Sequence, residues 1–183
     1  MATKYRHSAG FGRRMEYWLI GQMLREGLDV YVPLVDDIGV DAVIRKADNN
    51  FIEVQIKARS HEVKFTSAAL FAGIDHPLPR QNYYFVFRSE RLNTMWIMSS
   101  EELMAEASQI KNGRNKGLRA IWLNGTKINE ATGKREEYQR ERYKKFIAND
   151  FSRFKDAGAI VATPAPVNEG PEIGVSSRQK LMG

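Results

Sequence analysis

Residues 39–57 read GVDAVIRKADNNFIEVQIK, and this segment predicts two β-strands joined by a tight turn. Residues 42–44 are apolar, residues 48–50 are turn-forming, and residues 51–57 alternate between apolar and polar side chains. Because successive side chains of a strand point to opposite faces of the sheet, Glu53, Gln55 and Lys57 form a polar row behind an apolar one. The simplest interpretation of that row is a half-exposed strand that faces water.

The register of this hairpin decides what the polar row can do. A three-residue turn would place Asp41 opposite Lys57, with Gln55 diagonal to Asp41, and would place Arg45 opposite Glu53 as an ion pair. A turn with an even number of residues would instead direct Asp41 to the other face. An odd turn therefore predicts a carboxylate, an amide oxygen and an ammonium group at one end of the hairpin.

These residues carry a resemblance to a known family. Asp41, followed after thirteen residues by Gln55-Ile56-Lys57, together with Glu16 on a preceding helix, resembles the PD-(D/E)XK nuclease superfamily, particularly its Gln-x-Lys members. The similar region spans residues 8–100 and departs from the literal motif in having Val40 where the motif has Pro. The resemblance implies an α/β fold with a restriction-endonuclease-like core, in which helices flank a mixed central β-sheet.

The same resemblance implies a metal-dependent nuclease that hydrolyses phosphodiester bonds in DNA as an endonuclease. Asp41 would anchor the metal, Gln55 or Glu53 would supply the second oxygen, and Glu16 would contribute, for example through a water molecule. Lys57 would stabilise the charge growing on the phosphate or orient the attacking water. Oxygen ligands suit Mg²⁺, for which Mn²⁺ is a common substitute.

A second function class stays open at this point. Gln55 replaces a carboxylate and so lowers the negative charge available to hold a cation. The chain would then be a catalytically weak or inactive module of the same fold that binds nucleic acid or a partner protein. A third alternative is a structural protein whose basic helix binds an acidic protein.

Composition narrows the class of protein. The chain has 183 residues and 43% hydrophobic content, which suits one domain. We expect this domain to span residues 1–162, with residues 163–183, rich in Pro, Gly, Ser and Asn, as a disordered tail. The chain has no cysteine, which excludes disulfides, thiolate metal sites and cysteine nucleophiles.

The sequence predicts a soluble, cytoplasmic protein without a membrane segment. No run of residues approaches the ~18 apolar residues of a membrane span, and the first residues lack the apolar segment of a signal peptide. Dimerisation leaves no mark in the sequence, so a homodimer stays an open alternative.

Positive charge is concentrated in the second half of the chain. Residues 109–155 carry thirteen Lys and Arg against five Asp and Glu, whereas residues 1–60 carry nine against eight. A polyanion such as DNA is the natural partner of such a segment, and a solvated basic helix is the simpler alternative. The residues expected to contact nucleic acid are Arg13, Arg59, Arg114, Lys116, Lys144 and Lys145.

The remaining elements follow from periodicity and capping signals. Ser8 is expected to cap a helix over residues 10–26 that packs through Phe11, Met15, Trp18, Leu19 and Met23. Strands are expected at residues 28–33, 82–87, 94–98 and 120–123, and residues 65–71 are compatible with a short helix or a loop. Further helices are expected at residues 99–108, with Ser99 and Glu102 as a capping box, and at residues 135–156.

Overall fold

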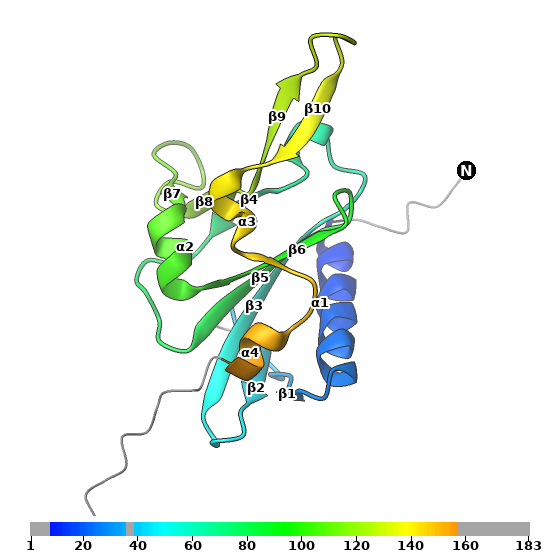
Figure 1. Ribbon diagram of the computed structural model, residues 1–183. Helices are drawn as coiled ribbons and strands as arrows, with labels where there is room; N and C mark the ends of the chain where they lie inside the picture. The colour runs from blue at the N-terminus through cyan, green and yellow to red at the C-terminus, as the bar shows by residue number, and fades with distance from the viewer. Residues whose placement is uncertain (1–7, 36–38, 157–183) are drawn as a thin grey trace, which may run out of the picture.

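The central element of the protein is a mixed six-stranded sheet in the described part of the chain (Figure 1). The computed structural model describes residues 8–35 and 39–156, so the expected tail at 163–183 lies outside the described residues. β3 and β5 pair in parallel, and the other neighbouring strands pair antiparallel. The strand order is β1 (Asp29–Tyr31), β2 (Ala42–Arg45), β3 (Phe51–Arg59), β5 (Tyr83–Ser89), β6 (Thr94–Ser99) and β11 (Ile147–Ala148).

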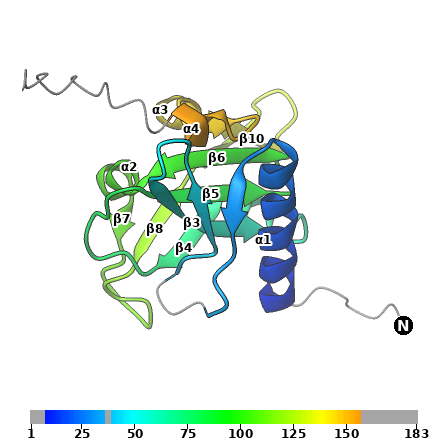
Figure 2. The same ribbon diagram turned by 90° about the horizontal axis from the view of Figure 1, so that it is seen from below.

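One face of this sheet is covered by α1 (Ser8–Arg25) and α4 (Ser152–Asp156), as Figure 2 shows for α1. Leu19 and Met23 of α1 belong to one buried cluster with Val54 and Ile56, which form the predicted apolar row of β3. The helix ends at a Schellman motif, in which Gly27 has a φ of 83° and the N–H of Leu28 bonds the carbonyl of Met23 at 3.1 Å.

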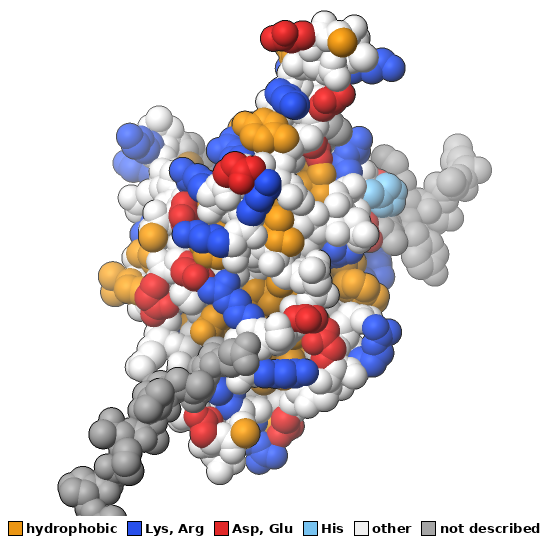
Figure 3. Space-filling model, in the orientation of Figure 1, with side chains coloured by type: hydrophobic (Ala, Val, Ile, Leu, Met, Phe, Trp, Pro, Cys, Tyr) orange, Lys and Arg blue, Asp and Glu red, His pale blue; other side chains and the backbone are white. Residues whose placement is uncertain are grey.

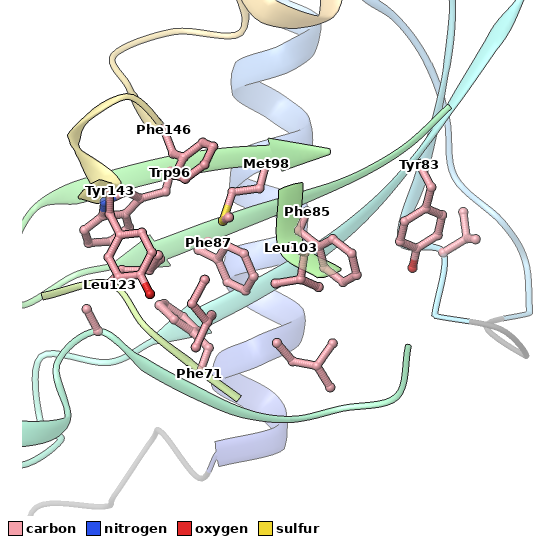
Figure 4. Packing of buried hydrophobic residues seen from close by; sticks show 14 residues of the cluster. Phe71, Tyr83, Phe85, Phe87, Trp96, Met98, Leu103, Leu123, Tyr143 and Phe146 are labelled. Atoms are coloured by element: carbon pink, nitrogen blue, oxygen red, sulfur yellow. The ribbon is translucent and has the colours of Figure 1, made fainter. Parts of the chain in front are cut away.

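The opposite face is covered by a small sheet and two short helices. The small sheet has the strand order β4 (Leu70–Ile74), β8 (Arg119–Trp122) and β7 (Ser108–Gln109), and the helices are α2 (Ser100–Glu106) and α3 (Glu141–Lys144). Phe85 and Phe87 of β5 pack here with Phe71, Leu103 and Phe146 (Figure 4). Helices therefore flank a mixed central sheet on both faces, which confirms the predicted α/β architecture.

The connection from β3 to β5 contains the largest element that the sequence left open. Residues 65–71 form a short 3₁₀-helix, η1 (Phe65–Ser67), followed by the start of β4. β4 pairs with β8, which lies about fifty residues later in the chain. This pairing returns the segment after Ile74 to the sheet face opposite α1.

The capping box of α2 is confirmed. Ser99 accepts a hydrogen bond from the N–H of Glu102, and the Glu102 side chain accepts one from the N–H of Ser99. Among the described residues, no helix is both long enough and apolar enough to cross a membrane.

The prediction of one long helix over residues 135–156 is wrong. The segment contains β10 (Arg135–Gln139), α3, β11 and α4. The aromatic residues have helical spacing, but Tyr143 and Phe146 pack on one face of the sheet while Phe151 and Phe154 pack on the other. Between these two pairs of aromatic residues the chain passes along the edge of β6. There β11 pairs with β6 and satisfies backbone groups of β6 that a helix could not bond.

A two-stranded hairpin of β9 (Asn124–Ile128) and β10 projects from the body of the protein (Figure 1). Tyr138 lies against Gly125 across the pair, at a place where a Cβ atom would overlap the tyrosine ring. Gly125 of β9 therefore accommodates a cross-strand aromatic ring.

Replacement of Phe154 tests the role of α4 in closing this fold. Phe154 is 1% exposed, and its ring centroid lies 5.6 Å from that of Tyr84. We expect Phe154→Ala to lower the free energy of unfolding by about 3–5 kcal/mol in urea denaturation, because it leaves a cavity between α4 and the sheet. Ile128→Ala, at a side chain that is 62% exposed, should change it by less than about 0.5 kcal/mol. Equal effects of the two variants would contradict this packing.

Candidate active site

The β2–β3 hairpin has an odd turn, as predicted, but a shifted register. The N–H of Lys46 bonds the carbonyl of Asn50 at 2.8 Å, which closes a three-residue turn over residues 47–49. Ala42 pairs with Val54, so the pairing is shifted by two residues from the predicted one, and regular pairing ends at Ala42. Gln55 and Lys57 share one face of β3, and the Asp41 carboxylate reaches the backbone of this strand at Ile56.

The expected ion pair between Arg45 and Glu53 is wrong for the same reason. Arg45 pairs in register with Phe51, and its guanidinium lies 2.7 Å from Asp29 on the neighbouring strand β1. Glu53 is bonded instead to Arg80, which precedes β5. Arg45 and Glu53 therefore each form an ion pair, but with Asp29 and Arg80 rather than with each other.

Asp41 lies where β2 and β3 separate. Its N–H still bonds the Val54 carbonyl at 2.9 Å, but the N–H of Ile56 bonds the Asp41 carboxylate at 2.6 Å. The Asp41 carboxylate thus takes the place of the backbone carbonyl that would accept the Ile56 N–H in a regular pair of strands. Asp41 is only 8% exposed. This bond positions the carboxylate at the opening between the two strands.

Gln55 supplies a buried acceptor beside this carboxylate. The residue is 8% exposed, and its Oε1 has no hydrogen-bond partner among the described residues. Its amide group packs against Gly39, whose φ is 72° and where a Cβ atom would overlap Gln55 Nε2. The Tyr83 hydroxyl donates to the Gly39 carbonyl at 2.6 Å and so fixes this close approach. A buried oxygen without a donor is costly unless a ligand occupies the adjacent space.

A cleft of about 450 Å³ opens in front of Gln55 and Lys57. It has two cationic side chains, Lys57 and Arg80, and one carboxylate, Asp75. The lining residues are Gly39, Gln55, Lys57, Gly73, Asp75, His76, Pro77, Leu78 and Arg80. The sequence did not single out Asp75, His76 or Arg80 as site residues, because β4 brings them to the cleft through a pairing that no local pattern reveals.

His76 is a buried member of the cleft wall. It is 3% exposed, and its Nε2 lies 2.7 Å from the Ser100 hydroxyl, which also accepts the N–H of Arg80 at 2.7 Å. Burial, and then the nearby charges of Arg80 and Arg119, lower the pKa of His76 from its ordinary value of 6.5. Because the Ser100 oxygen accepts the N–H of Arg80, its O–H can donate to Nε2 of a neutral His76 imidazole.

The two other expected acids lie in different positions. Glu53 belongs to the polar row of β3 but bonds Arg80, whose guanidinium stacks over the Tyr83 ring at 4.0 Å. Glu16 is on α1, which packs on the opposite face of the sheet from Gln55 and Lys57. Its carboxylate lies 2.9 Å from Arg13 on the same helix, without hydrogen-bond geometry.

The basic residues expected to contact nucleic acid separate into two groups. Arg114 and Lys116 are exposed in a loop whose Asn115 approaches Gly73, so this loop adjoins the cleft. The other four bind partners within the chain. Arg13 pairs with Glu16, Arg59 donates to the Leu70 carbonyl, Lys144 pairs with Glu141, and Lys145 pairs with Glu106. Figure 3 shows acidic and basic side chains interspersed over one face rather than a single basic field.

The donor set at the strand opening consists of oxygens. Within residues 8–35 and 39–156, no group of three or more His, Asp or Glu side chains lies close enough together to hold a metal ion. The candidate ligands at this opening are one carboxylate, that of Asp41, which bonds the Ile56 N–H, and one amide oxygen, the unpaired Gln55 Oε1. Two oxygen ligands match a Mg²⁺ ion that keeps most of its water.

Comparisons with known proteins show similarity to solved structures alone. No family model matches the chain, and the comparison with curated proteins likewise found no match. Among solved structures, the chain is similar to the bacterial homing endonuclease I-Ssp6803I, with 16% sequence identity and a TM-score of 0.45. The alignment covers 62% of this chain and 89% of the endonuclease.

Two glycines allow the packing of Gln55 to be tested by stability. Gly39 and Gly27 both have positive φ, 72° and 83°, but only Gly39 faces another residue where a Cβ atom would lie. Gly27→Ala should cost about 1–3 kcal/mol of unfolding free energy from backbone strain alone. Gly39→Ala should cost about 1–3 kcal/mol more, because Gln55 must move. Equal losses in urea denaturation would show that Gln55 does not pack against Gly39.

The lowered pKa of His76 predicts a pH dependence of stability. Because the folded-state pKa lies below the unfolded value of 6.5, the unfolded chain binds a proton more readily between these two values. The contribution of His76 to stability is therefore fully present above pH 6.5 and is lost as the pH falls through 6.5 towards the folded-state pKa. Urea denaturation between pH 5 and 8 should show this loss, and His76→Gln should reduce it. An unchanged slope in His76→Gln would contradict a neutral buried His76.

Proposed function

We propose that this protein is a metal-dependent endonuclease that hydrolyses phosphodiester bonds in DNA. The observation that carries the proposal is the Gln55 Oε1 atom, which is buried without a hydrogen-bond partner among the described residues. Gln55 lines a cleft with Lys57, and the Asp41 carboxylate bonds the N–H of the residue between them, Ile56. An unpaired oxygen beside a carboxylate is a site for a cation, and a cation beside a lysine is a site for a phosphate.

The residues present fit a Mg²⁺ ion. Asp41 and Gln55 would hold it directly, with Mn²⁺ as a substitute. Glu53 is the less suitable second ligand because Arg80 already binds it, and Glu16 is unsuitable because α1 packs on the opposite face of the sheet from Gln55. When bound, the ion supplies positive charge to the phosphoryl oxygens and lowers the pKa of a coordinated water.

The chain's own residues would do the remaining work. Lys57 lines the cleft and would donate hydrogen bonds to a non-bridging phosphoryl oxygen, which gains charge in the transition state. Arg80 stacks on Tyr83 and would present the rest of its guanidinium to the adjacent phosphate. The Asp41–Ile56 bond would hold the carboxylate in one orientation without a rearrangement on binding.

DNA is the proposed partner because the chain is basic and because exposed cations adjoin the cleft. The net charge is +6. Arg114 and Lys116 lie in the loop beside Gly73 and would contact phosphates flanking the reacting one. A homodimer would place two such clefts on the two strands of a duplex.

A binding module without hydrolysis is the second candidate. It is favoured by the absence of a three-acid cluster in the described part of the chain and by the amide at position 55. The two functions differ in a single assay, because a module would retard DNA without cutting it in the presence of Mg²⁺ or Mn²⁺.

Nicking of supercoiled plasmid tests the proposal. Wild-type protein should nick the plasmid with Mg²⁺ or Mn²⁺ and not with EDTA. Asp41→Asn and Lys57→Met should each lower the rate by about 10²–10³, since each removes a charge that acts on the phosphate. Asn keeps an oxygen acceptor for the Ile56 N–H, so Asp41→Asn is a sharper variant than Asp41→Ala.

The matched control is Lys64→Met, which removes an exposed lysine outside the cleft and should leave the rate unchanged. Plasmid retardation without metal-dependent nicking would favour the binding module. Wild-type rates in both Asp41→Asn and Lys57→Met would exclude this site.

A further inference from the structure

α1 carries a polar and aromatic stripe that its core-packing residues do not include. Arg14, Trp18, Gln22 and Arg25 stand at positions i, i+4, i+8 and i+11, so they share one face of the helix. The prediction that Trp18 packs in the core is wrong, since this side chain is 48% exposed. The buried residues Leu19 and Met23 lie on the adjacent face.

Arg88 of β5 lies against this stripe. Its guanidinium carbon is 5.6 Å from the centroid of the Trp18 ring, and one of its terminal nitrogens bonds Asn93 at 2.5 Å. Its Nε is buried without a hydrogen-bond partner, and Arg88 forms no ion pair within the described residues. Burial lowers the pKa of Arg88 from its ordinary value, although the charge of Glu90, which also lines the smaller of the two hollows described next, acts in the opposite direction. The Glu90 carboxylate lies within hydrogen-bond distance of His61, so the Nε of Arg88, unpartnered among the described residues, is free for an anion from outside the chain.

Two hollows meet at this pair of residues. One has a volume of about 430 Å³ and the other about 330 Å³, and Trp18 and Arg88 line both of them. The larger hollow is further lined by the carboxamides of Gln22, Asn93, Gln139 and Asn149. Its one carboxylate, Glu26, already accepts the N–H of Phe151 at 3.0 Å.

This combination fits a nucleotide better than a peptide or a lipid. An exposed indole offers a stacking surface for a base, carboxamides match the donor and acceptor edges of bases, and the guanidinium matches a phosphate. Arg14, in the smaller hollow, and Arg25, in the larger, are eleven residues apart, which corresponds to about 16 Å along the helix. That distance spans about five stacked nucleotides at ~3.4 Å each.

We propose that single-stranded nucleic acid binds along this face of α1, with a base stacked on Trp18 and a backbone phosphate at Arg88. This surface and the cleft lie on opposite faces of the sheet. Arg88 is on the face that α1 covers, because neighbouring residues of a strand point to opposite faces and Phe87 packs on the other one. Lys57 is paired with Phe87 and therefore lies on that other face. The proposal shares its class of partner with the endonuclease function but does not depend on cleavage.

Fluorescence anisotropy with a 5′-labelled twelve-residue oligothymidylate, in EDTA, tests the proposal on the full chain. Trp18→Ala should weaken binding about ten- to a hundredfold, the loss expected for one stacked base. Arg88→Gln should weaken it by at least fivefold. The matched control is Tyr31→Ala, which removes another half-exposed ring beneath an arginine, Arg45, and should change binding by less than twofold.

A second measurement uses exposed residues whose replacement does not disturb the core. The double variant Arg14→Gln/Arg25→Gln should lower the slope of log affinity against log salt concentration by about 1.4, because two cations no longer contact the single strand. Wild-type affinity in Trp18→Ala and Arg88→Gln, or an unchanged salt slope in the double variant, would overturn the proposal.

A competitor identifies the form of the ligand. Thymidine 5′-monophosphate should displace the oligonucleotide only at concentrations at least a hundredfold above the oligonucleotide's own Kd, because it contacts one position of the stripe. Equal affinity for the free nucleotide would overturn the binding of a strand. The binding assay contains no divalent cation and is therefore independent of cleavage. If the wild-type chain failed to bind the oligonucleotide but still nicked plasmid, this surface would be refuted and the endonuclease proposal would stand.

Discussion

The hydrogen bond from the Ile56 N–H to the Asp41 carboxylate controls the geometry of the candidate site. In a regular hairpin a backbone carbonyl would accept this N–H, and the two strands would stay closed. Here the carboxylate takes that place at 2.6 Å, so β2 separates from β3 without leaving a buried donor unpaired. Gln55 and Lys57, the residues on either side of Ile56, line the cleft.

The other side of the opening depends on a close approach of backbone to side chain. Gly39 has no Cβ atom and a positive φ, and the Tyr83 hydroxyl holds its carbonyl. Gln55 can therefore lie flat against the main chain, with its oxygen buried and unpaired among the described residues. A carboxylate at this position would add negative charge next to Asp41 and would repel it unless a cation were present. The amide avoids that cost in the metal-free protein, in exchange for weaker cation binding.

Local patterns in the sequence predicted the elements whose side chains obey a single period. The alternation in β3 was enough to place Gln55 and Lys57 on one face, and the turn has an odd number of residues, as predicted. The exact pairing was missed because it depends on which asparagine takes the left-handed conformation, and Asn49 does so. The helix expected at 135–156 failed because helical spacing does not reveal that Phe146 and Phe154 pack on opposite faces of the sheet. Asp75, His76 and Arg80 join the site only through tertiary pairing of β4.

The central claim is that Asp41 and Gln55 together hold a divalent cation. Anomalous diffraction from crystals soaked in Mn²⁺ tests this claim most directly. The account predicts one peak at bonding distance, about 2.0–2.3 Å, from both an Asp41 carboxylate oxygen and Gln55 Oε1. The absence of density there in crystals that bind Mn²⁺ elsewhere, with Gln55 still in its buried position, would contradict it.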